Sequence, residues 1–387
     1  MTRKSILAGL VCSLTLGFLR TGAPAQTADE SLRNEVQAAI TKGIRYLKTK
    51  QDAATGVFGA ADTPAFTALA TMAIMGDPAL KGKPMPDEAK KAYEFLLSSQ
   101  MADGSICKEG KLANYNTSLA LTALTVAGRE NKYRDAILKA RRFLVGGQID
   151  NGDKGKDDTV DDGGIGYGTT PKSDLSNTHF ALEALYYARL YLQDDPALKN
   201  EPQLNYAAAI EFVSKCQNLA ATNKSTWVSD DAKNKGGFIY KPGESKLPKP
   251  DDLGNGKTAL RSYGSMSYAG LLSFIYAELD PKDQRIKAVK EWLSKNYSVK
   301  ENPGIGQEGL FYYYHTMAKA MSLAEMDFVE TPDGKRINWR SELAKQMFNL
   351  QKEDGSWSNE TGRWMEKDSI LVTAYSVLAL EHLIRRL

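Results

Sequence analysis

The chain has 387 residues, of which 42% are hydrophobic and 25% are charged, so it can bury a large core and is not disordered in bulk. Its formal charge is +3, and the three basic residues Arg3, Lys4 and Arg20 account for all of it, which leaves residues 26–387 neutral. A neutral chain without a long basic run is poorly suited to nucleic acid, so we expect no nucleic-acid partner.

The first 25 residues predict a secretory signal peptide. Arg3 and Lys4 precede an apolar run over residues 6–19, and residues 23–25 (Ala-Pro-Ala) offer a cleavage site before Gln26. The run is shorter than the ~20 residues that a bilayer span needs, so a membrane anchor is the weaker interpretation. Because no later segment is long and apolar enough either, we expect no stable membrane span. We expect an exported protein, periplasmic or secreted.

A repeated pattern extends from about Asp29 to Leu387. Each copy has an amphipathic segment that ends near a Gln, then a Gly-rich turn, then a small apolar segment. Copies recur about every 50–80 residues. The Gln residues of the pattern are Gln51, Gln100, Gln148, Gln217 and Gln351, and Tyr297 replaces Gln in the fifth copy. This period predicts about six helix hairpins in a single domain over residues 26–387.

The two segments of each copy predict two layers of helices. The second segments are rich in Ala, Gly and Leu, which permits the close packing of an inner ring. They begin near Phe66, Thr117, Thr178, Tyr268, Thr316 and Thr373. The first segments carry Lys and Glu on one side, which suits an outer ring facing solvent. Because few alternating strand-like runs occur, we predict an all-α fold.

The pattern Lys/Arg-Gly/Ala-x-x-aromatic-Leu-x-x-x-Gln, followed by Gly-x-aromatic, resembles the QW repeat of squalene–hopene cyclases and protein prenyltransferase β-subunits. The resemblance covers nearly the whole chain after residue 26. It implies an α/α toroid, in which each Gln ties the end of an outer helix to the following turn beside an aromatic side chain. The aromatic residues that match are Phe58, Tyr167, Phe238 and Trp357.

The acidic motif of the cyclases does not carry over to this chain. Those enzymes protonate an alkene with an Asp-x-Asp-Asp motif on an inner helix. The nearest match is formed by Asp157, Asp158, Asp161 and Asp162, which lack that spacing and lie in a polar loop. Clustered Asp side chains in water stay ionised, so we expect a solvated loop or a weak cation site here.

The zinc site of the prenyltransferases is also incomplete. The segment Tyr313-Tyr314-His315-Thr316 resembles the family's Tyr-His-Thr, but Tyr263-Gly264-Ser265 stands where Asp-x-Cys is expected. One His with Tyr and Ser would not hold zinc tightly. We therefore expect no metal and no cofactor, and the sequence leaves open whether the chain is an enzyme.

The junctions between turns and inner helices define the expected site. They meet at one end of a toroid, where helix N-termini give a mildly positive potential. The longest inserts, residues 150–162 and 241–257, belong to the same junctions and would form a rim. Tyrosines near these helix starts are Tyr115, Tyr263, Tyr268, Tyr312, Tyr313 and Tyr314.

Within this mouth, His315 and Tyr314 are the catalytic candidates, because a neutral His at a helix N-terminus can act as a weak base. The candidate ligand-binding residues are Tyr263, Tyr268, Tyr313, Asp174 and His179. Each has a structural alternative, which is core packing for the Tyr and His residues and helix capping for Asp174.

Three functions remain open. The first is an exported toroid that binds an isoprenoid-like or other apolar small molecule in the lumen. Whether it also transforms this molecule is left open. The second is a secreted glycan-active α/α-barrel enzyme, which needs paired carboxylates or a Lys/Arg–Tyr set in the lumen. The third is a non-catalytic toroid whose rim binds a protein. An apolar lumen favours the first, a polar lumen with converging acids the second, and a plugged lumen the third.

Overall fold

The computed structural model describes residues 28–60, 62–128, 130–150, 158–168, 172–247, 249–252, 254 and 258–387. The predicted signal peptide and its cleavage site lie outside these residues, as does Asp157. No helix in the described part of the chain is long and apolar enough to cross a membrane.

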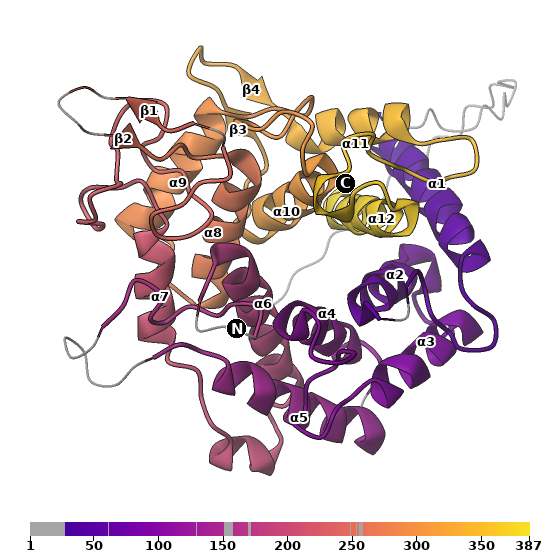
Figure 1. Ribbon diagram of the computed structural model, residues 1–387. Helices are drawn as coiled ribbons and strands as arrows, with labels where there is room; N and C mark the ends of the chain where they lie inside the picture. Colours follow the sequence, from indigo (N-terminus) through magenta and orange to yellow (C-terminus); the bar gives the residue numbers. More distant parts are fainter. Residues whose placement is uncertain are drawn as a thin grey trace, which may run out of the picture.

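Twelve α-helices of the described residues alternate between an outer and an inner ring (Figure 1). The inner helices are α2 (Pro64–Gly76), α4 (Ala113–Leu124), α6 (Leu175–Tyr191), α8 (Gly264–Tyr276), α10 (Leu310–Leu323) and α12 (Ser369–Ile384). The outer helices are α1 (Ala28–Thr49), α3 (Asp87–Ser98), α5 (Asn131–Gly146), α7 (Tyr206–Lys215), α9 (Gln284–Lys295) and α11 (Trp339–Leu350). Each inner helix packs against the next, and α12 packs against α2, so the inner ring closes. The predicted α/α toroid of six hairpins is confirmed.

Short elements occur only in the connections. Two antiparallel hairpins, β1–β2 and β3–β4, and three 3₁₀ turns lie between the described helices. Their bounds are β1 (Asp251–Asp252), β2 (Thr258–Ala259), β3 (Val329–Glu330), β4 (Arg336–Ile337), η1 (Pro78–Leu80), η2 (Pro196–Asn200) and η3 (Arg363–Met365).

Burial separates the two rings as the sequence pattern predicts. The outer helix α3 buries Ala89, Ala92, Tyr93 and Leu96, whose spacing forms one stripe on a helix. The inner helix α4 instead buries every residue except Tyr115, because its neighbours cover it on all sides. The inner ring is therefore the core of the molecule, and its small residues permit the close approach of helix to helix.

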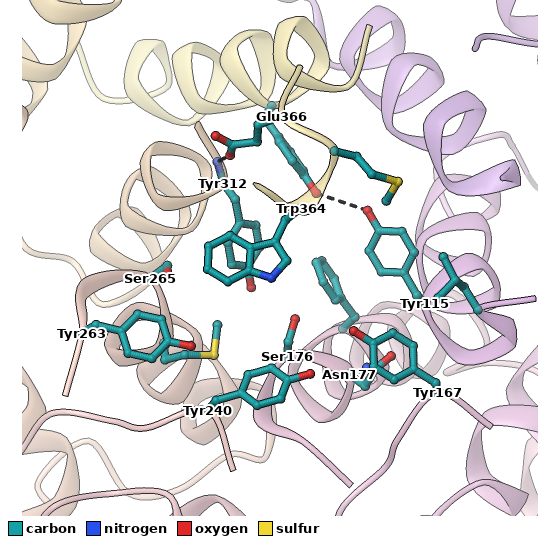
Figure 2. A pocket seen from close by; sticks show the side chains of 15 residues that line it. Tyr115, Tyr167, Ser176, Asn177, Tyr240, Tyr263, Ser265, Tyr312, Trp364 and Glu366 are labelled. Carbon is teal, nitrogen blue, oxygen red and sulfur yellow. Dashed lines mark hydrogen bonds between the residues drawn. The ribbon is translucent and has the colours of Figure 1, made fainter. Parts of the chain in front are cut away.

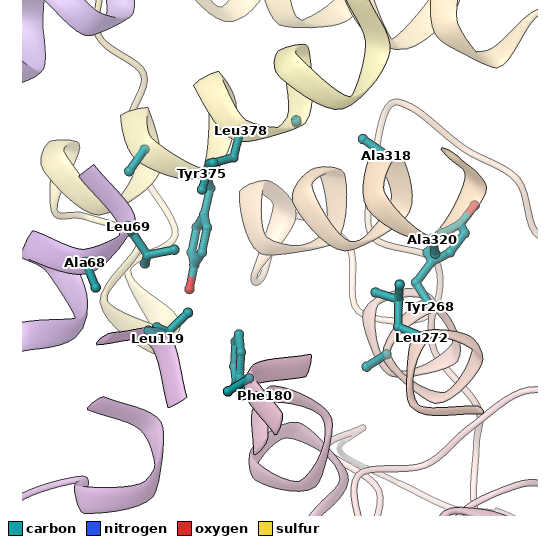
Figure 3. Close-up of a cluster of buried hydrophobic side chains, with 14 of the residues drawn as sticks. Ala68, Leu69, Leu119, Phe180, Tyr268, Leu272, Ala318, Ala320, Tyr375 and Leu378 are labelled. Carbon is teal, nitrogen blue, oxygen red and sulfur yellow. The ribbon is translucent and has the colours of Figure 1, made fainter. Parts of the chain in front are cut away.

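Large side chains from the inner ring meet in the lumen. Leu69 of α2, Leu119 of α4, Phe180 of α6 and Tyr375 of α12 converge there (Figure 3). All four are at most 4% exposed. The lumen is thus filled near its middle.

Five Gln side chains join successive hairpins. Each donates from Nε2 to a glycine carbonyl in its own turn and to a carbonyl in, or directly before, the next outer helix. Gln351 donates to Gly355 and to Ala39 of α1, both at 3.0 Å, and so closes the outer ring. The other four are Gln51, Gln100, Gln148 and Gln217. In the fifth copy, the hydroxyl of Tyr297 donates instead to Glu342 of α11 at 3.2 Å.

Four of the five Gln residues, Gln51, Gln100, Gln148 and Gln217, form a short backbone bridge to a residue of the following turn. Phe58 pairs with Gln51 and Phe238 pairs with Gln217, as expected. The predicted partnership of Tyr167 with Gln148 is wrong, because Ile165 holds that place. Tyr167 lies two residues further along and lines the mouth of the toroid instead.

Candidate functional site

A cavity of about 160 Å³ opens at the N-terminal ends of five inner helices, α4, α6, α8, α10 and α12 (Figure 2). Fifteen residues line it, and eight of them are aromatic. The aromatic residues are Tyr115, Tyr167, Phe180, Tyr240, Tyr263, Tyr312, Trp364 and Tyr375. The cavity therefore occupies the mouth that the repeat predicts, and its walls are mainly apolar.

The floor of the cavity is a circuit of four rings from four inner helices. The ring centroids of Tyr115 and Phe180 lie 5.2 Å apart, those of Phe180 and Tyr312 6.0 Å, and those of Tyr312 and Tyr375 5.9 Å. The hydroxyls of Tyr115 and Tyr375 are 3.2 Å apart and close the circuit (Figure 2). Pairs at these distances stabilise one another, so we call these four side chains the aromatic floor.

The rim above the floor comes from loops. Tyr167 precedes α6, Tyr240 lies between α7 and α8, and Trp364 and Met365 belong to η3 before α12. Figure 2 shows Tyr263, Tyr240 and Tyr167 in an arc along the lower side of the opening, with their hydroxyls turned inward. The rim thus adds hydroxyl groups to a cavity whose floor is apolar.

Two rim residues adopt a left-handed backbone. Trp364 and Met365 have φ values of 54° and 64°, and their exposed fractions are 41% and 44%. Gly309 makes room for this conformation, because a Cβ atom there would lie 2.9 Å from two ring carbons of Trp364. Bulky residues rarely hold such a backbone, and strain of this kind concentrates at functional sites.

Glu366 is the only carboxylic acid among the described residues that line the cavity. It is 1% exposed and accepts hydrogen bonds from the backbone N–H of Tyr312 at 2.8 Å and the amide of Asn359 at 2.7 Å. Burial raises its pKa, while these N–H donors act in the opposite direction. Glu366 therefore caps the N-terminus of α10 from inside the cavity wall.

Two further carboxylates cap inner helices at the mouth. Asp174 accepts hydrogen bonds from the backbone and side-chain amides of Asn177 in α6, at 2.9 and 2.8 Å. Asp368 accepts one from Ile370 in α12 at 2.8 Å. Negative charges at helix N-termini offset the helix dipoles. These carboxylates therefore reduce the positive potential expected at the mouth for α6, α10 and α12.

The structure separates the predicted catalytic pair. The hydroxyls of Tyr313 and Tyr314 donate to the carbonyls of Ser298 and Val299, at 2.7 and 2.6 Å, in the segment after α9. His315 is 2% exposed and stacks on Tyr375, with 5.3 Å between ring centroids. Successive side chains of a helix point about 100° apart. Tyr314 therefore faces the segment after the outer helix α9, whereas His315 faces the inner helix α12. Tyr312, which the sequence placed among the mouth tyrosines, is the one that reaches the cavity.

The predicted ligand-binding residues also take different places. Tyr263 lines the cavity. Tyr268 is buried, with its hydroxyl 3.6 Å from the sulfur of Met321. Asp174 is a helix cap behind the wall and does not line the cavity itself. His179 is 1% exposed and lies beside Phe180, on the side of the core.

A polar layer lies about one helical turn below the aromatic floor. Lys319 and Glu183 form a buried ion pair at 2.6 Å, and His179 lies 3.8 Å from Glu183. Burial, and after it the charge of Lys319, lowers the pKa of His179, His315 and His382 well below 6.5. His179 and His315 are thus buried in the core and His382 is half-buried, and the lowered pKa favours the neutral form of each.

Other groups of the described residues offer little chemistry. Nowhere in this part of the chain do three or more His, Cys, Asp or Glu side chains gather to hold a metal ion. Asp161 accepts hydrogen bonds from the backbone N–H and hydroxyl of Ser173, at 2.8 and 2.9 Å, and so fixes the rim before α6. Asp162 accepts a hydrogen bond from the hydroxyl of Thr159.

Sequence reasoning missed the loop part of the cavity. Tyr240, Trp364, Met365 and Glu366 come from connections that have no helical period. The one available signal was that Tyr240 directly precedes the long insert at residues 241–257. The helix-borne residues Tyr115, Tyr263 and Tyr312 were found because the repeat marks where inner helices begin.

The fold and the cavity define an α/α toroid with a small aromatic pocket at the N-terminal ends of its inner helices. No protein-family model and no curated protein matches the chain. Solved structures are similar in fold. The type II terpene cyclase MstE from Scytonema has a TM-score of 0.52 at 13% identity, over 92% of this chain and 99% of that one.

Two further structures are comparable. A variant of that cyclase in complex with its substrate, geranylgeranyl dihydroxybenzoate, has a TM-score of 0.50 at 12% identity, over 92% of this chain and 99% of that one. An unsaturated glucuronyl hydrolase specific for heparin has a TM-score of 0.52 at 12% identity, over 93% of this chain and 99% of that one. At these identities the likeness shows the toroid fold alone, and both chemistries occur on it.

Proposed function

We propose that this protein binds an isoprenoid-like or other apolar molecule at the mouth of its toroid, with one end of the ligand on the aromatic floor. The observation that carries the proposal is the closed circuit of Tyr115, Phe180, Tyr312 and Tyr375 from four separate helices. Such a surface gains free energy by covering an apolar group.

The size of the cavity limits which chemical group of the ligand can lie on the aromatic floor. A cavity of about 150 Å³ holds one benzene ring, and the volume here is about 160 Å³. One small ring or one branched five-carbon unit therefore fits on the floor. The rest of a longer ligand would leave past the exposed side chains of Tyr167 and Trp364 at the rim.

The proposal is binding and not cyclisation. Protonating an alkene needs an unusually strong acid, because an alkene is a very weak base. Glu366 is the carboxyl at the cavity wall, and N–H donors of Tyr312 and Asn359 stabilise its ionised form. A carboxyl group whose hydrogen bonds favour the ionised form is suited to capping a helix and is a poor acid for protonating an alkene.

The similar cyclase acts on a geranylgeranyl compound, which supports an isoprenoid-like ligand here. A glycan-active role has less support. Glycoside hydrolysis uses two carboxyl groups across the scissile bond, and Glu366 is alone among the described lining residues. A heparin-like sugar is also anionic, and no Lys or Arg lines the described cavity.

Binding of geraniol, measured by titration calorimetry, tests the proposal. Phe180→Ala removes one ring of the floor, and we expect at least a tenfold loss of affinity, which corresponds to about 1.4 kcal/mol. Tyr313→Phe is the matched control, because its hydroxyl faces Ser298 and not the cavity. Unchanged affinity in a folded Phe180→Ala protein would contradict the proposal.

Export remains a separate proposal that rests on residues 1–25. N-terminal sequencing of the protein from its native source should find Gln26 first. Recovery of the chain with Met1 in the cytoplasm would contradict it.

A further inference from the structure

The lining of the cavity offers electron-rich groups and no positive charge. Ring faces and phenolic oxygens carry partial negative charge, and eight of the fifteen lining residues are aromatic. The other described lining residues include two serines, one asparagine and one glutamate, but no Lys, Arg or His. A cavity of this composition is attractive to a positively charged group and unattractive to an anion.

Two buried carboxylates lie at this cavity, and neither is in ion-pair contact with a described basic residue. Glu366 forms part of the wall, and Asp174 lies directly behind Ser176 and Asn177, which line it. They are 1% and 4% exposed, and the described residues place no Lys or Arg in ion-pair contact with either, although the charge of Lys246 acts on Asp174 from a longer distance. Burial raises the pKa of both carboxyl groups. A cation in the cavity would therefore stabilise their ionised forms.

The nearest basic side chains of the rim are already neutralised. Lys246 pairs with Glu244 at 2.5 Å, and its Nζ lies 4.0 Å from the ring centroid of Tyr240. Arg363 pairs with Glu308. Neither Lys246 nor Arg363 lines the cavity, so the rings of the floor remain available to a ligand.

We propose that the group seated on the aromatic floor is an organic cation, an alkylated ammonium of the trimethylammonium kind, attracted by ring faces and by the carboxylates of Glu366 and Asp174. Aromatic cages that bind quaternary ammonium groups use the same physics. A trimethylammonium group has the shape of a tert-butyl group and fits a cavity of about 160 Å³. The inference rests on the proposed function, because it names the charge of the ligand in the same pocket.

A pair of isosteric ligands tests the charge directly. Choline and 3,3-dimethylbutan-1-ol have the same shape, and only choline is positive. Calorimetric titration of the wild-type protein at one fixed ionic strength should show choline binding at least tenfold more tightly. Equal or tighter binding of the neutral alcohol would overturn the inference and leave the proposed function standing. Binding of neither would overturn the inference, and the geraniol titration would then decide the proposed function separately.

Variants at Tyr312 separate the ring face from the hydroxyl. Tyr312→Phe keeps the ring, so we expect choline affinity to stay within about threefold of wild type. Tyr312→Leu removes the ring, and we expect at least a fivefold loss for choline and a smaller loss for the alcohol. An equal loss for both ligands would contradict a cation–ring contact.

Glu366→Gln tests the carboxylate. We expect a weaker affinity for choline and an unchanged affinity for the alcohol. Because Glu366 also caps α10, the alcohol titration shows whether the pocket of this variant is intact. Unchanged choline affinity in a variant that still binds the alcohol would exclude Glu366 from cation recognition.

Discussion

Trp364 and Met365 show how single residues shape the mouth of the toroid. Their φ values of 54° and 64° place two bulky residues in the left-handed region. This conformation costs about 1–2 kcal/mol for a residue other than glycine. Both side chains are nevertheless exposed beside the cavity. The strained backbone costs free energy that burial of these two side chains does not offset. We therefore infer that both side chains have a role at the pocket.

Replacing Met365 with glycine should therefore not weaken the fold. Met365→Gly removes about 1–2 kcal/mol of strain and adds about 0.5–1 kcal/mol of chain entropy to the unfolded state. We expect the free energy of unfolding in urea to stay unchanged or to rise by about 1 kcal/mol, while affinity for geraniol falls. A loss of more than about 1 kcal/mol would show that Met365 is needed for stability.

Gly309→Ala is the opposing change at the same place. Its Cβ atom would lie 2.9 Å from the ring of Trp364, at a φ of +61°. We expect this variant to be less stable than wild type by at least about 1 kcal/mol. Together the two variants test whether the strained rim and the glycine beneath it form one unit.

His315 predicts a specific dependence of stability on pH. Burial, then the charges of Lys319, His382 and His179, lowers its pKa well below 6.5. Below pH 6.5 the unfolded chain binds a proton that folded His315 does not. The free energy of unfolding therefore falls as the pH drops, by up to about 1.4 kcal/mol per pH unit for this group.

The variant His315→Gln isolates this contribution, because Gln does not titrate. Buried carboxyl groups with raised pKa, such as Glu366, act in the opposite direction, but they are present in both proteins. We expect the stability advantage of wild type over the variant to shrink by about 1 kcal/mol between pH 7.5 and pH 5.5. A constant difference would show that His315 does not resist protonation in the folded state.

At the scale of single residues, the sequence could place the start of an inner helix but not its rotation. Tyr312, Tyr313, Tyr314 and His315 are consecutive, and each step turns the side chain by about 100°. A shift of one residue in the helix start decides which tyrosine faces the lumen. That phase depends on the packing of α10 against its neighbours, which a single sequence does not contain.

At the scale of elements, the Gln residues link each hairpin to the next. Gln351 joins its own turn to α1 and thereby connects the last hairpin to the first. The resemblance to the QW repeat implied the tie of each Gln to its own turn. The second bond, to the next outer helix, could not be predicted, since it depends on how neighbouring hairpins pack.

Gln351→Ala should weaken the closure of the ring. It leaves the carbonyls of Ala39 and Gly355 without their donor, and we expect a loss of about 1–3 kcal/mol in urea unfolding. Gln307→Ala is the matched control, because its one bond to Lys300 is exposed, and it should cost less than about 0.5 kcal/mol. An equal loss in the free energy of unfolding for both variants would show that closing the ring through Gln351 adds no more stability than an exposed hydrogen bond.

The connections between helices explain why the sequence did not predict the loop part of the cavity. Helices repeat with a period that shows which side is buried, but loops have no period. The rim residues Tyr240 and Trp364 therefore carried no signal of their direction. The same holds for Glu366, whose role as a cap of α10 joins residues that lie 54 apart in the chain.

At the scale of the whole molecule, the toroid is open at one end of its lumen and filled below. The ion pair of Glu183 and Lys319 lies beneath the aromatic floor, where it links α6 to α10 across the lumen. It limits the depth of the pocket, so a ligand can enter only as far as the floor. The ring of hairpins was predictable because it repeats, whereas this polar layer occurs once.

Breaking the pair on one side should be costly. Glu183→Gln leaves Lys319 as a buried charge without its partner, and we expect a loss of about 3–5 kcal/mol in the free energy of unfolding. The double variant Glu183→Met/Lys319→Met removes both charges and should lose less. If the single variant lost under about 1 kcal/mol, water would have to reach Lys319 in the folded protein.

The central claim is that the aromatic pocket at the mouth is where this toroid binds its ligand. A crystal structure of the protein soaked with geraniol tests it most directly. We predict electron density for the ligand on the rings of Phe180 and Tyr312, with its far end leaving beside Trp364. Ligand density only elsewhere on the molecule, or an empty pocket at saturating geraniol, would contradict the claim.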